Sequence, residues 1–263
     1  MKVVGMIPAR LQSSRLPEKA LVDIEGLPMV VHTCKRSQLA QTLDQVYLAT
    51  DSERIREVAQ ANGIQVIMTG THHQTGSDRL AEACSNIDCD IVVNVQGDEP
   101  LVDPEHIDAI VNVMKSDDGI KLALGVTPYK KKKSTSDIKA VLDLEGNVLY
   151  CSRTDLPSEA RTPVEDMWKM VFIVGFRKEF LIQYSSWEPT PLERIEYNEY
   201  LRVIEHGEKI RAVRLDQARI SVDTPEDLAG VRELMKKDTI RFRYMQPADG
   251  TGGIPAKRLT IQV

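Results

Sequence analysis

IPARLQSSRLPEKAL, residues Ile7–Leu21, follows directly on the apolar run Val3–Ile7, which predicts a short buried strand. Its basic and hydroxyl side chains are Arg10, Ser13, Ser14, Arg15 and Lys19. Cations neutralise phosphate charge, and the amides and hydroxyls of a loop donate to phosphate oxygens, so a strand that ends in such a loop favours a polyphosphate site. The alternative is a solvated basic loop, because runs of charge usually face water.

The composition is typical of a globular protein with a sizeable core. The chain has 263 residues, of which 42% are hydrophobic and 28% charged. The net charge of -5 gives no bulk signal for nucleic-acid or membrane binding. No apolar run reaches the length of about 18 residues that a membrane span needs, and the N-terminal run is too short for a signal peptide.

Cysteine and histidine spacing points away from a metal-binding module. Cys34, Cys84, Cys89 and Cys151 form no CxxC pair, so we expect buried reduced thiols in a cytoplasmic protein. The five histidines show no HxxH or HExxH spacing, which predicts no zinc site.

The order of elements predicts an α/β fold. In the first half we expect strands at 3–7, 45–49, 65–68 and 90–95, and helices at 28–39, 53–62, 77–85 and 104–115, with Asp51 or Ser52 as a helix cap. Repeated β-α units predict a mostly parallel sheet, in which ligands bind beyond the carboxyl ends of the strands.

The second half is predicted to be richer in strands. We expect strands at 121–127, 171–176 and 210–215, a hairpin of 140–142 and 148–150, and helices at 192–205 and 225–235. Asp223 or Thr224 would cap the last helix, with Asp227 in the capping-box position. Residues after Lys237 are expected to be loosely ordered.

Polar residues at the predicted strand ends are the candidates for chemistry. Asp98 follows the strand 90–95, and Mg²⁺ favours carboxylate oxygens and substrate phosphates. Asp98 and Asp223 would form a metal site if both faced one cleft, but each also has a plain structural role open to it, in a turn or as a cap. The stretch Gln74–Arg79 either recognises a base or ribose or only caps its helix.

Eight motifs in order resemble the 3-deoxy-manno-octulosonate (Kdo) cytidylyltransferases, also called CMP-Kdo synthetases. The resemblance covers about residues 2–235, and so many colinear motifs rarely arise by chance. The motifs are IPARLQSSRLPEKAL (7–21), ATDSER (49–54), HQTGSDRL (73–80), IVVNVQGDEP (91–100), AVLDLEGNVLYCSR (140–153), WEPTPLERIE (187–196), HGEKI (206–210) and VDTPEDL (222–228).

The resemblance implies the nucleotide-diphospho-sugar-transferase α/β sandwich, with a mixed, mostly parallel sheet and a smaller β-containing dimerisation lobe. It implies one domain over 1–237, in which about 128–215 form the sugar-binding and dimerisation lobe, and a tail, 238–263, of unknown role. The implied activity is Mg²⁺-dependent transfer of CMP from CTP to a sugar acid, with release of pyrophosphate, for lipopolysaccharide synthesis in the cytoplasm. The implied assembly is a homodimer.

The resemblance also implies a role for each motif residue. Arg10, Ser13, Arg15 and Lys19 would bind the triphosphate, and Arg10 and Lys19 would share the catalytic role with Asp98 and Asp223, the two magnesium ligands. The cytidine side would be Gln74, Ser77 and Arg79. The sugar side would be Gln96, Arg153 and Glu199, together with Met170, Val174 and Tyr200.

The sugar region departs from the common family pattern. Where many relatives read RHxGIYGYR, residues 169–177 read KMVFIVGFR, so that Met170 replaces histidine and Val174 replaces tyrosine. Tyr200 stands where relatives with LEQLR have glutamine, and in the first motif Glu18 and Ala20 stand where relatives have glycine and proline.

These changes favour 8-amino-3,8-dideoxy-manno-octulosonate as the sugar. An ammonium group is stabilised by a carboxylate such as Glu199 and is no longer repelled by a cationic histidine at position 170. The alternatives are ordinary Kdo with neutral drift and, less in keeping with the motifs, a sialic acid.

Two readings outside enzymology stay open at this point. One is a nucleotide sensor on the same fold, against which the pair Asp98 and Asp223 argues, because a sensor needs no metal carboxylates. The other is an interaction scaffold that uses the run Lys130–Lys133, which is otherwise a solvated loop.

Overall fold

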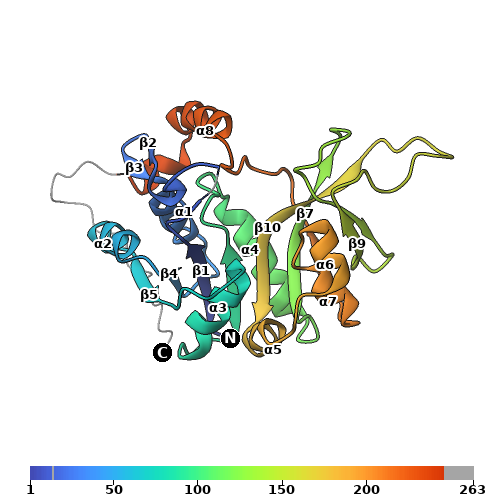
Figure 1. Ribbon diagram of the computed structural model, residues 1–263, viewed down its shortest axis with the longest axis horizontal. Helices are drawn as coiled ribbons and strands as arrows, with labels where there is room; N and C mark the ends of the chain where they lie inside the picture. Colours follow the sequence, from blue (N-terminus) through green and yellow to red (C-terminus); the bar gives the residue numbers. More distant parts are fainter. Residues whose placement is uncertain (14, 246–263) are drawn as a thin grey trace, which may run out of the picture.

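The structure is a computed structural model that describes residues 1–13 and 15–245, and it is built around one mixed sheet (Figure 1). The strand order is β11-β7-β10-β6-β1-β4-β5. The bounds are β1 Val3–Ala9, β4 Gln45–Thr50, β5 Gln65–Met68, β6 Ile91–Val95, β7 Leu122–Tyr129, β10 Met167–Arg177 and β11 Arg211–Arg214. Along this path of described strands, only β10 runs antiparallel to both neighbours, which confirms the mixed, mostly parallel sheet.

Helices cover both faces of the sheet. Alternate residues of each buried strand point to opposite sides, and two separate apolar clusters result. One cluster packs the sheet against α1 (Met29–Ser37), α2 (Glu53–Ala61) and α4 (Pro104–Ser116). The other packs it against α3 (Gly76–Ser85) and α5 (Lys178–Ser185), a helix that the sequence analysis did not anticipate.

A hairpin extends the sheet beside β10 (Figure 1). Its strands are β8 (Lys139–Leu142) and β9 (Val148–Ser152), as predicted, and β8 also pairs with β10. A two-stranded ribbon, β2 (Asp23–Ile24) and β3 (Leu27–Pro28), lies apart from the main sheet, after the single-turn helix η1 (Lys19–Leu21).

The helix caps settle two alternatives. Ser52, rather than Asp51, caps α2 and accepts a hydrogen bond from the amide of Ile55. Thr224 caps α8 (Pro225–Lys237), and its capping box with Asp227 is present as predicted.

The single helix predicted over 192–205 is wrong. The structure has α6 (Pro191–Glu196) and α7 (Leu201–Glu205), separated at Tyr197, whose backbone adopts a left-handed φ of 50°. Glu196 explains the break, because its carboxylate accepts hydrogen bonds from the Ser152 hydroxyl and the Arg153 amide of the β9 end. Contacts with the hairpin therefore override the local helical pattern.

The expectation that all residues after Lys237 are loosely ordered is also wrong. Asp238 forms an ion pair with the buried Arg36, and the Tyr244 hydroxyl lies 2.8 Å from His32 Nδ1. Between them runs the short helix η2 (Ile240–Arg243). The glycine-rich stretch 249–253 lies outside the described residues.

Two expectations drawn from composition hold. Each of the four cysteines is free and buried. Among the described residues, no helix is long and apolar enough to cross a membrane.

Candidate active site

A polar cavity of about 290 Å³ lies at the carboxyl ends of β1 and β6, next to the start of α8. This is the edge where open α/β sheets bind ligands. Nine of the predicted site residues line it: Arg10, Ser13, Arg15, Lys19, Gln74, Arg79, Gln96, Asp98 and Asp223. We call it the basic cavity.

Lys19 joins the two candidate metal ligands. Its ammonium lies 2.6 Å from Asp98 Oδ2 and 3.2 Å from Asp223 Oδ1, and it donates to the carbonyl of Val222 at 2.9 Å. Arg15 contacts the same Asp223 oxygen at 2.8 Å. Two carboxylates far apart in the sequence thus converge on one cation.

This donor set fits a magnesium ion. Both carboxylates present an oxygen atom to the Lys19 ammonium, and Arg10 and Arg15 line the same cavity as cations for an anionic partner such as a phosphate. Mg²⁺ is usually held in this way, by one or two carboxylates together with substrate phosphates. Asp98 and Asp223 are the residues that would hold it.

Glu99 is a site residue that the sequence analysis missed. Burial and the neighbouring Asp98 and Asp223 raise the pKa of Glu99 to about 8, against the opposing effect of Lys169 and Lys19. The carboxyl is therefore largely protonated at neutral pH. The sequence QGDEP shows two adjacent carboxylates but gives no sign of which one is desolvated.

Arg79 fixes the floor of the basic cavity. It is buried, and its guanidinium donates to Asp51 Oδ2 at 3.0 Å and to Thr69 Oγ1 at 2.6 Å, at the ends of β4 and β5. Thr75 and Asp78 form the capping box that begins α3. Ser77, predicted beside them on the cytidine side, is fully buried and lines neither this cavity nor the next.

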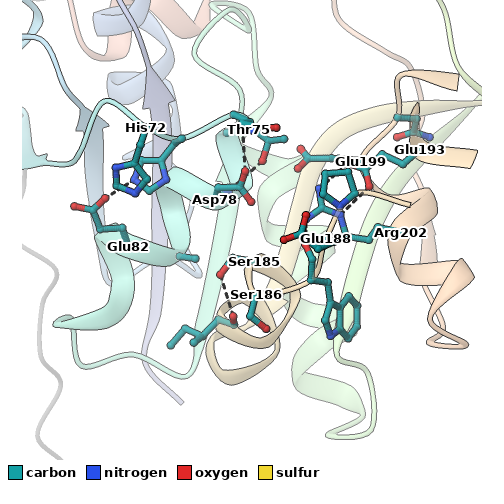
Figure 2. Close-up of a pocket in the computed structure, with 18 of the residues that line it drawn as sticks. His72, Thr75, Asp78, Glu82, Ser185, Ser186, Glu188, Glu193, Glu199 and Arg202 are labelled. Carbon is teal, nitrogen blue, oxygen red and sulfur yellow. Dashed lines mark hydrogen bonds and ion pairs between the residues drawn. The ribbon is translucent and has the colours of Figure 1, made fainter. Parts of the chain in front are cut away.

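A larger cavity of about 1160 Å³ adjoins the basic cavity (Figure 2). The two share the wall formed by residues 73–76. The larger cavity is lined by the carboxylates Asp78, Glu82, Glu188, Glu193 and Glu199 and by the guanidinium groups of Arg194 and Arg202. Because Arg202 pairs with Glu193 through two hydrogen bonds, the remaining lining is predominantly acidic. We call it the acidic cavity.

Glu199 is the predicted sugar residue that faces the acidic cavity (Figure 2). The Tyr184 hydroxyl lies 3.1 Å from its carboxylate. Burial raises the pKa of Glu199, Asp78 adds to that effect, and hydrogen bonds from Thr75 and Tyr184 oppose it. Glu199 is therefore a desolvated carboxyl group, and its charge depends on the group that lies next to it in the acidic cavity.

The other predicted sugar residues lie elsewhere. Met170, Val174 and Tyr200 are buried in the core, and none of them lines either cavity. The Arg153 guanidinium donates to the backbone carbonyls of residues 135, 136, 196 and 197, so it ties the end of β9 to α6. In this structure Gln96 and Glu199 alone of the six line a cavity.

The histidines show what a spacing rule can miss. No HxxH motif exists, yet the adjacent His72 and His73 come within reach of Glu82 at the edge of the acidic cavity. The prediction of no zinc site was based on the HxxH and HExxH motifs. Those motifs do not include two adjacent histidines that approach a carboxylate on a helix, as His72 and His73 approach Glu82.

Comparison with known proteins gives one consistent match. The family model for cytidylyltransferases matches residues 4–210. The chain is 41% identical to the 3-deoxy-manno-octulosonate cytidylyltransferase of Geobacter metallireducens, over 90% of this chain and 99% of that protein. It is 38% identical to the mitochondrial 3-deoxy-manno-octulosonate cytidylyltransferase of Arabidopsis thaliana, and the match covers 90% of this chain and 84% of that protein.

Solved structures agree with the sequences. The structure of CMP:2-keto-3-deoxy-manno-octonic acid synthetase complexed with CTP matches with a TM-score of 0.87 and 34% identity, over 90% of this chain and 99% of that one. A cytidylyltransferase from Leptospira borgpetersenii shares the fold, with a TM-score of 0.63 and 20% identity. This match covers 90% of this chain and 88% of that one. The chain therefore belongs to the cytidylyltransferase family, among the 3-deoxy-manno-octulosonate cytidylyltransferases.

Proposed function

We propose that this protein transfers CMP from CTP to a 3-deoxy-octulosonic acid and releases pyrophosphate. The observation that carries the proposal is the convergence of Asp98, Asp223 and Lys19 in the basic cavity, with Arg10 and Arg15 beside them. The relative solved with CTP supports the choice of nucleotide. A sensor that only binds nucleotide would not need this pair of carboxylates.

The chemistry follows from the residues of the basic cavity. The anomeric hydroxyl of the sugar attacks the α-phosphorus, a new P–O bond forms, and the bond to the departing pyrophosphate breaks, so no covalent enzyme intermediate is needed. Arg10, Arg15 and Lys19 would bind the triphosphate and stabilise the charge that develops on the leaving group. A Mg²⁺ ion held by Asp98 and Asp223 would neutralise phosphate charge and acidify the attacking hydroxyl.

We propose 8-amino-3,8-dideoxy-manno-octulosonate as the preferred sugar. The acidic cavity supports this choice, because it offers Glu199 and other carboxylates to an ammonium group. Ordinary Kdo, which carries a hydroxyl at that position, would gain much less from the same carboxylates.

Steady-state turnover decides between the two sugars. With CTP and Mg²⁺, pyrophosphate release should give a higher kcat/KM for the 8-amino sugar than for Kdo. Equal or better turnover of Kdo would reject the amino-sugar preference and leave the CTP chemistry standing. Absence of pyrophosphate release with both sugars, and with a sialic acid, would reject the proposed activity itself.

We also propose that the protein is a cytoplasmic homodimer that associates through the hairpin and α6. Their exposed apolar side chains include Leu144, Leu149, Ile195 and Tyr197, and Tyr197 is 83% exposed. Free buried cysteines suit a reducing compartment. Sedimentation equilibrium of the protein and of Leu149→Glu tests the dimer, which should dissociate in the variant.

A further inference from the structure

The described part of the chain holds one group of three or more histidine, cysteine or acidic side chains whose ligand atoms lie close enough for a metal ion. It consists of His72, His73 and Glu82, with one ligand atom from each residue and all three atoms within 4.8 Å of one another. All three residues line the acidic cavity, and Figure 2 shows His72 and Glu82 across from Glu199. The group is separate from the carboxylate pair Asp98 and Asp223, which lines the basic cavity.

The Glu82 carboxylate is already held in place by the loop before α3. Both of its oxygens lie 3.1 Å from the Gly70 amide, which donates to them, and His73 Nε2 donates to Oε2. The Glu82 side chain is exposed to solvent, where a glutamate carboxylate is ionised at neutral pH. A metal ligand must be deprotonated and oriented, and Glu82 meets both requirements.

Gly70 makes room for the second histidine. A Cβ at this position would lie 2.5 Å from His72 Nδ1 and 3.5 Å from Glu82 Oε2. The backbone at Gly70 therefore approaches the imidazole more closely than any other residue type would allow. The rings of His72 and His73 lie side by side, with their centroids 4.2 Å apart, so both imidazoles face the same small space.

We propose that His72, His73 and Glu82 bind a divalent ion of the zinc class at the rim where the two cavities meet. Two imidazoles and one carboxylate suit Zn²⁺, Co²⁺ or Ni²⁺ rather than Mg²⁺, which prefers oxygen ligands alone. His72 and Glu82 are exposed to solvent, so the ion has an entry path and an open position for water. The imidazole binds in its neutral form: the proton on His73 Nε2 is exchanged through solvent for one on Nδ1, and the freed Nε2 lone pair goes to the metal.

Equilibrium dialysis against Zn²⁺ tests the site in the full-length, chelator-treated protein. An excess of Mg²⁺ keeps the carboxylate pair of the basic cavity occupied during the titration. We expect one zinc ion per chain and an affinity that rises with pH, because protons compete with the metal for the imidazole nitrogens. Zinc binding should persist in Asp98→Asn, because that variant alters only the basic cavity.

Single substitutions assign the ligands. His72→Ala removes an exposed side chain and should leave the fold intact, while zinc affinity falls by at least about tenfold. Glu82→Gln keeps an acceptor for the Gly70 amide but loses the anionic ligand, and Gly70→Ala displaces His72 without removing a ligand, so both should also weaken binding. His206→Gln is the matched control, since His206 stacks on Trp187 and does not belong to the group.

Two results would overturn the proposal. One is the absence of stoichiometric zinc binding by the unaltered protein under these conditions. The other is equal zinc affinity in His72→Ala, Glu82→Gln and the His206→Gln control, which would place the ion elsewhere. The inference does not depend on the proposed sugar or nucleotide, because its readout is metal binding rather than turnover.

Discussion

Replacing Asp98 with asparagine separates the catalytic role of this carboxylate from its role in stability. The substitution keeps the size of the side chain and removes its charge. In the structure Asp98 Oδ2 lies 2.6 Å from the Lys19 ammonium, and the side chains of Asp98 and Lys19 are 28% and 18% exposed. Lys19 retains Asp223 and the carbonyl of Val222 as partners in the variant.

The two effects differ in size. A partly exposed ion pair contributes about 1 kcal/mol to the free energy of unfolding. Because Lys19 keeps two partners, the Tm should fall by no more than about 2–4 °C. If Asp98 holds Mg²⁺ as proposed, loss of its charge should lower kcat/KM by about a thousandfold, or about 4 kcal/mol of transition-state stabilisation.

Pyrophosphate release at several Mg²⁺ concentrations, together with thermal unfolding, measures both effects. Asp216→Asn is the control, because Asp216 is an exposed carboxylate paired with His106 and lines neither cavity. The double variant with Asp223→Asn should be little worse than either single variant, since both residues would hold the same ion. Activity of Asp98→Asn within about tenfold of the parent would refute the metal assignment.

Three further results are expected. Glu199→Gln should raise KM for the 8-amino sugar more than KM for Kdo. In the unaltered protein, KM for the amino sugar should fall as the pH rises through the elevated pKa of Glu199, because only the ionised carboxylate attracts the ammonium group. A KM that does not change with pH would contradict this role. Tyr200→Phe should change stability by no more than about 1 kcal/mol in denaturant titrations, because the buried hydroxyl faces Ser77 and Asn94 but forms no hydrogen bond of good geometry with them. A larger loss of stability would mean that the hydroxyl is firmly bonded to them. Glu193→Gln should lower the free energy of unfolding by about 3–5 kcal/mol and the Tm by about 10 °C, because the variant leaves the buried Arg202 without its carboxylate partner. A fall in Tm of only about 1–2 °C would show that water replaces the lost partner.

Local patterns in the sequence were enough for most of the sheet. The strands β1, β4 and β6 are largely buried apolar runs that end in polar loops, and such runs are recognisable without knowledge of their neighbours. β5 is a short edge strand with no fully buried residue, and it was found from the same kind of run. The N-terminal cap of α8 was equally local, because Thr224 and Asp227 contact each other across a single turn.

Long-range contacts account for what the sequence did not predict. The break between α6 and α7 depends on Glu196 reaching the end of β9, and the order of residues 238–245 depends on Arg36, a buried cation that pairs with Asp238. Neither partner is near in the sequence. The meeting of Asp98, Asp223 and Lys19 is of the same kind, and only the family resemblance placed them together in advance.

Glu18 shows how a departure from the family pattern is accommodated. Relatives have glycine at this position, and the backbone of Glu18 adopts a left-handed φ of 52°, which glycine tolerates and other residues adopt at a cost of about 1 kcal/mol. Its carboxylate pairs with Arg54 at the start of α2. The turn that leads into Lys19 is thus retained although the glycine is lost.

The two halves of the site differ in how freely they can change. In the basic cavity, the loop after β6 approaches the end of β1 so closely that a Cβ on Gly97 would lie 2.8 Å from the Pro8 carbonyl oxygen. Substitutions there would push apart the backbones that carry Arg10 and Asp98. Met170, Val174 and Tyr200, at which the sequence departs from the common family pattern, are instead packed in the core, where neighbouring side chains can repack around a changed residue. Close backbone contact therefore restricts substitution at Gly97, whereas the three core positions can change by repacking.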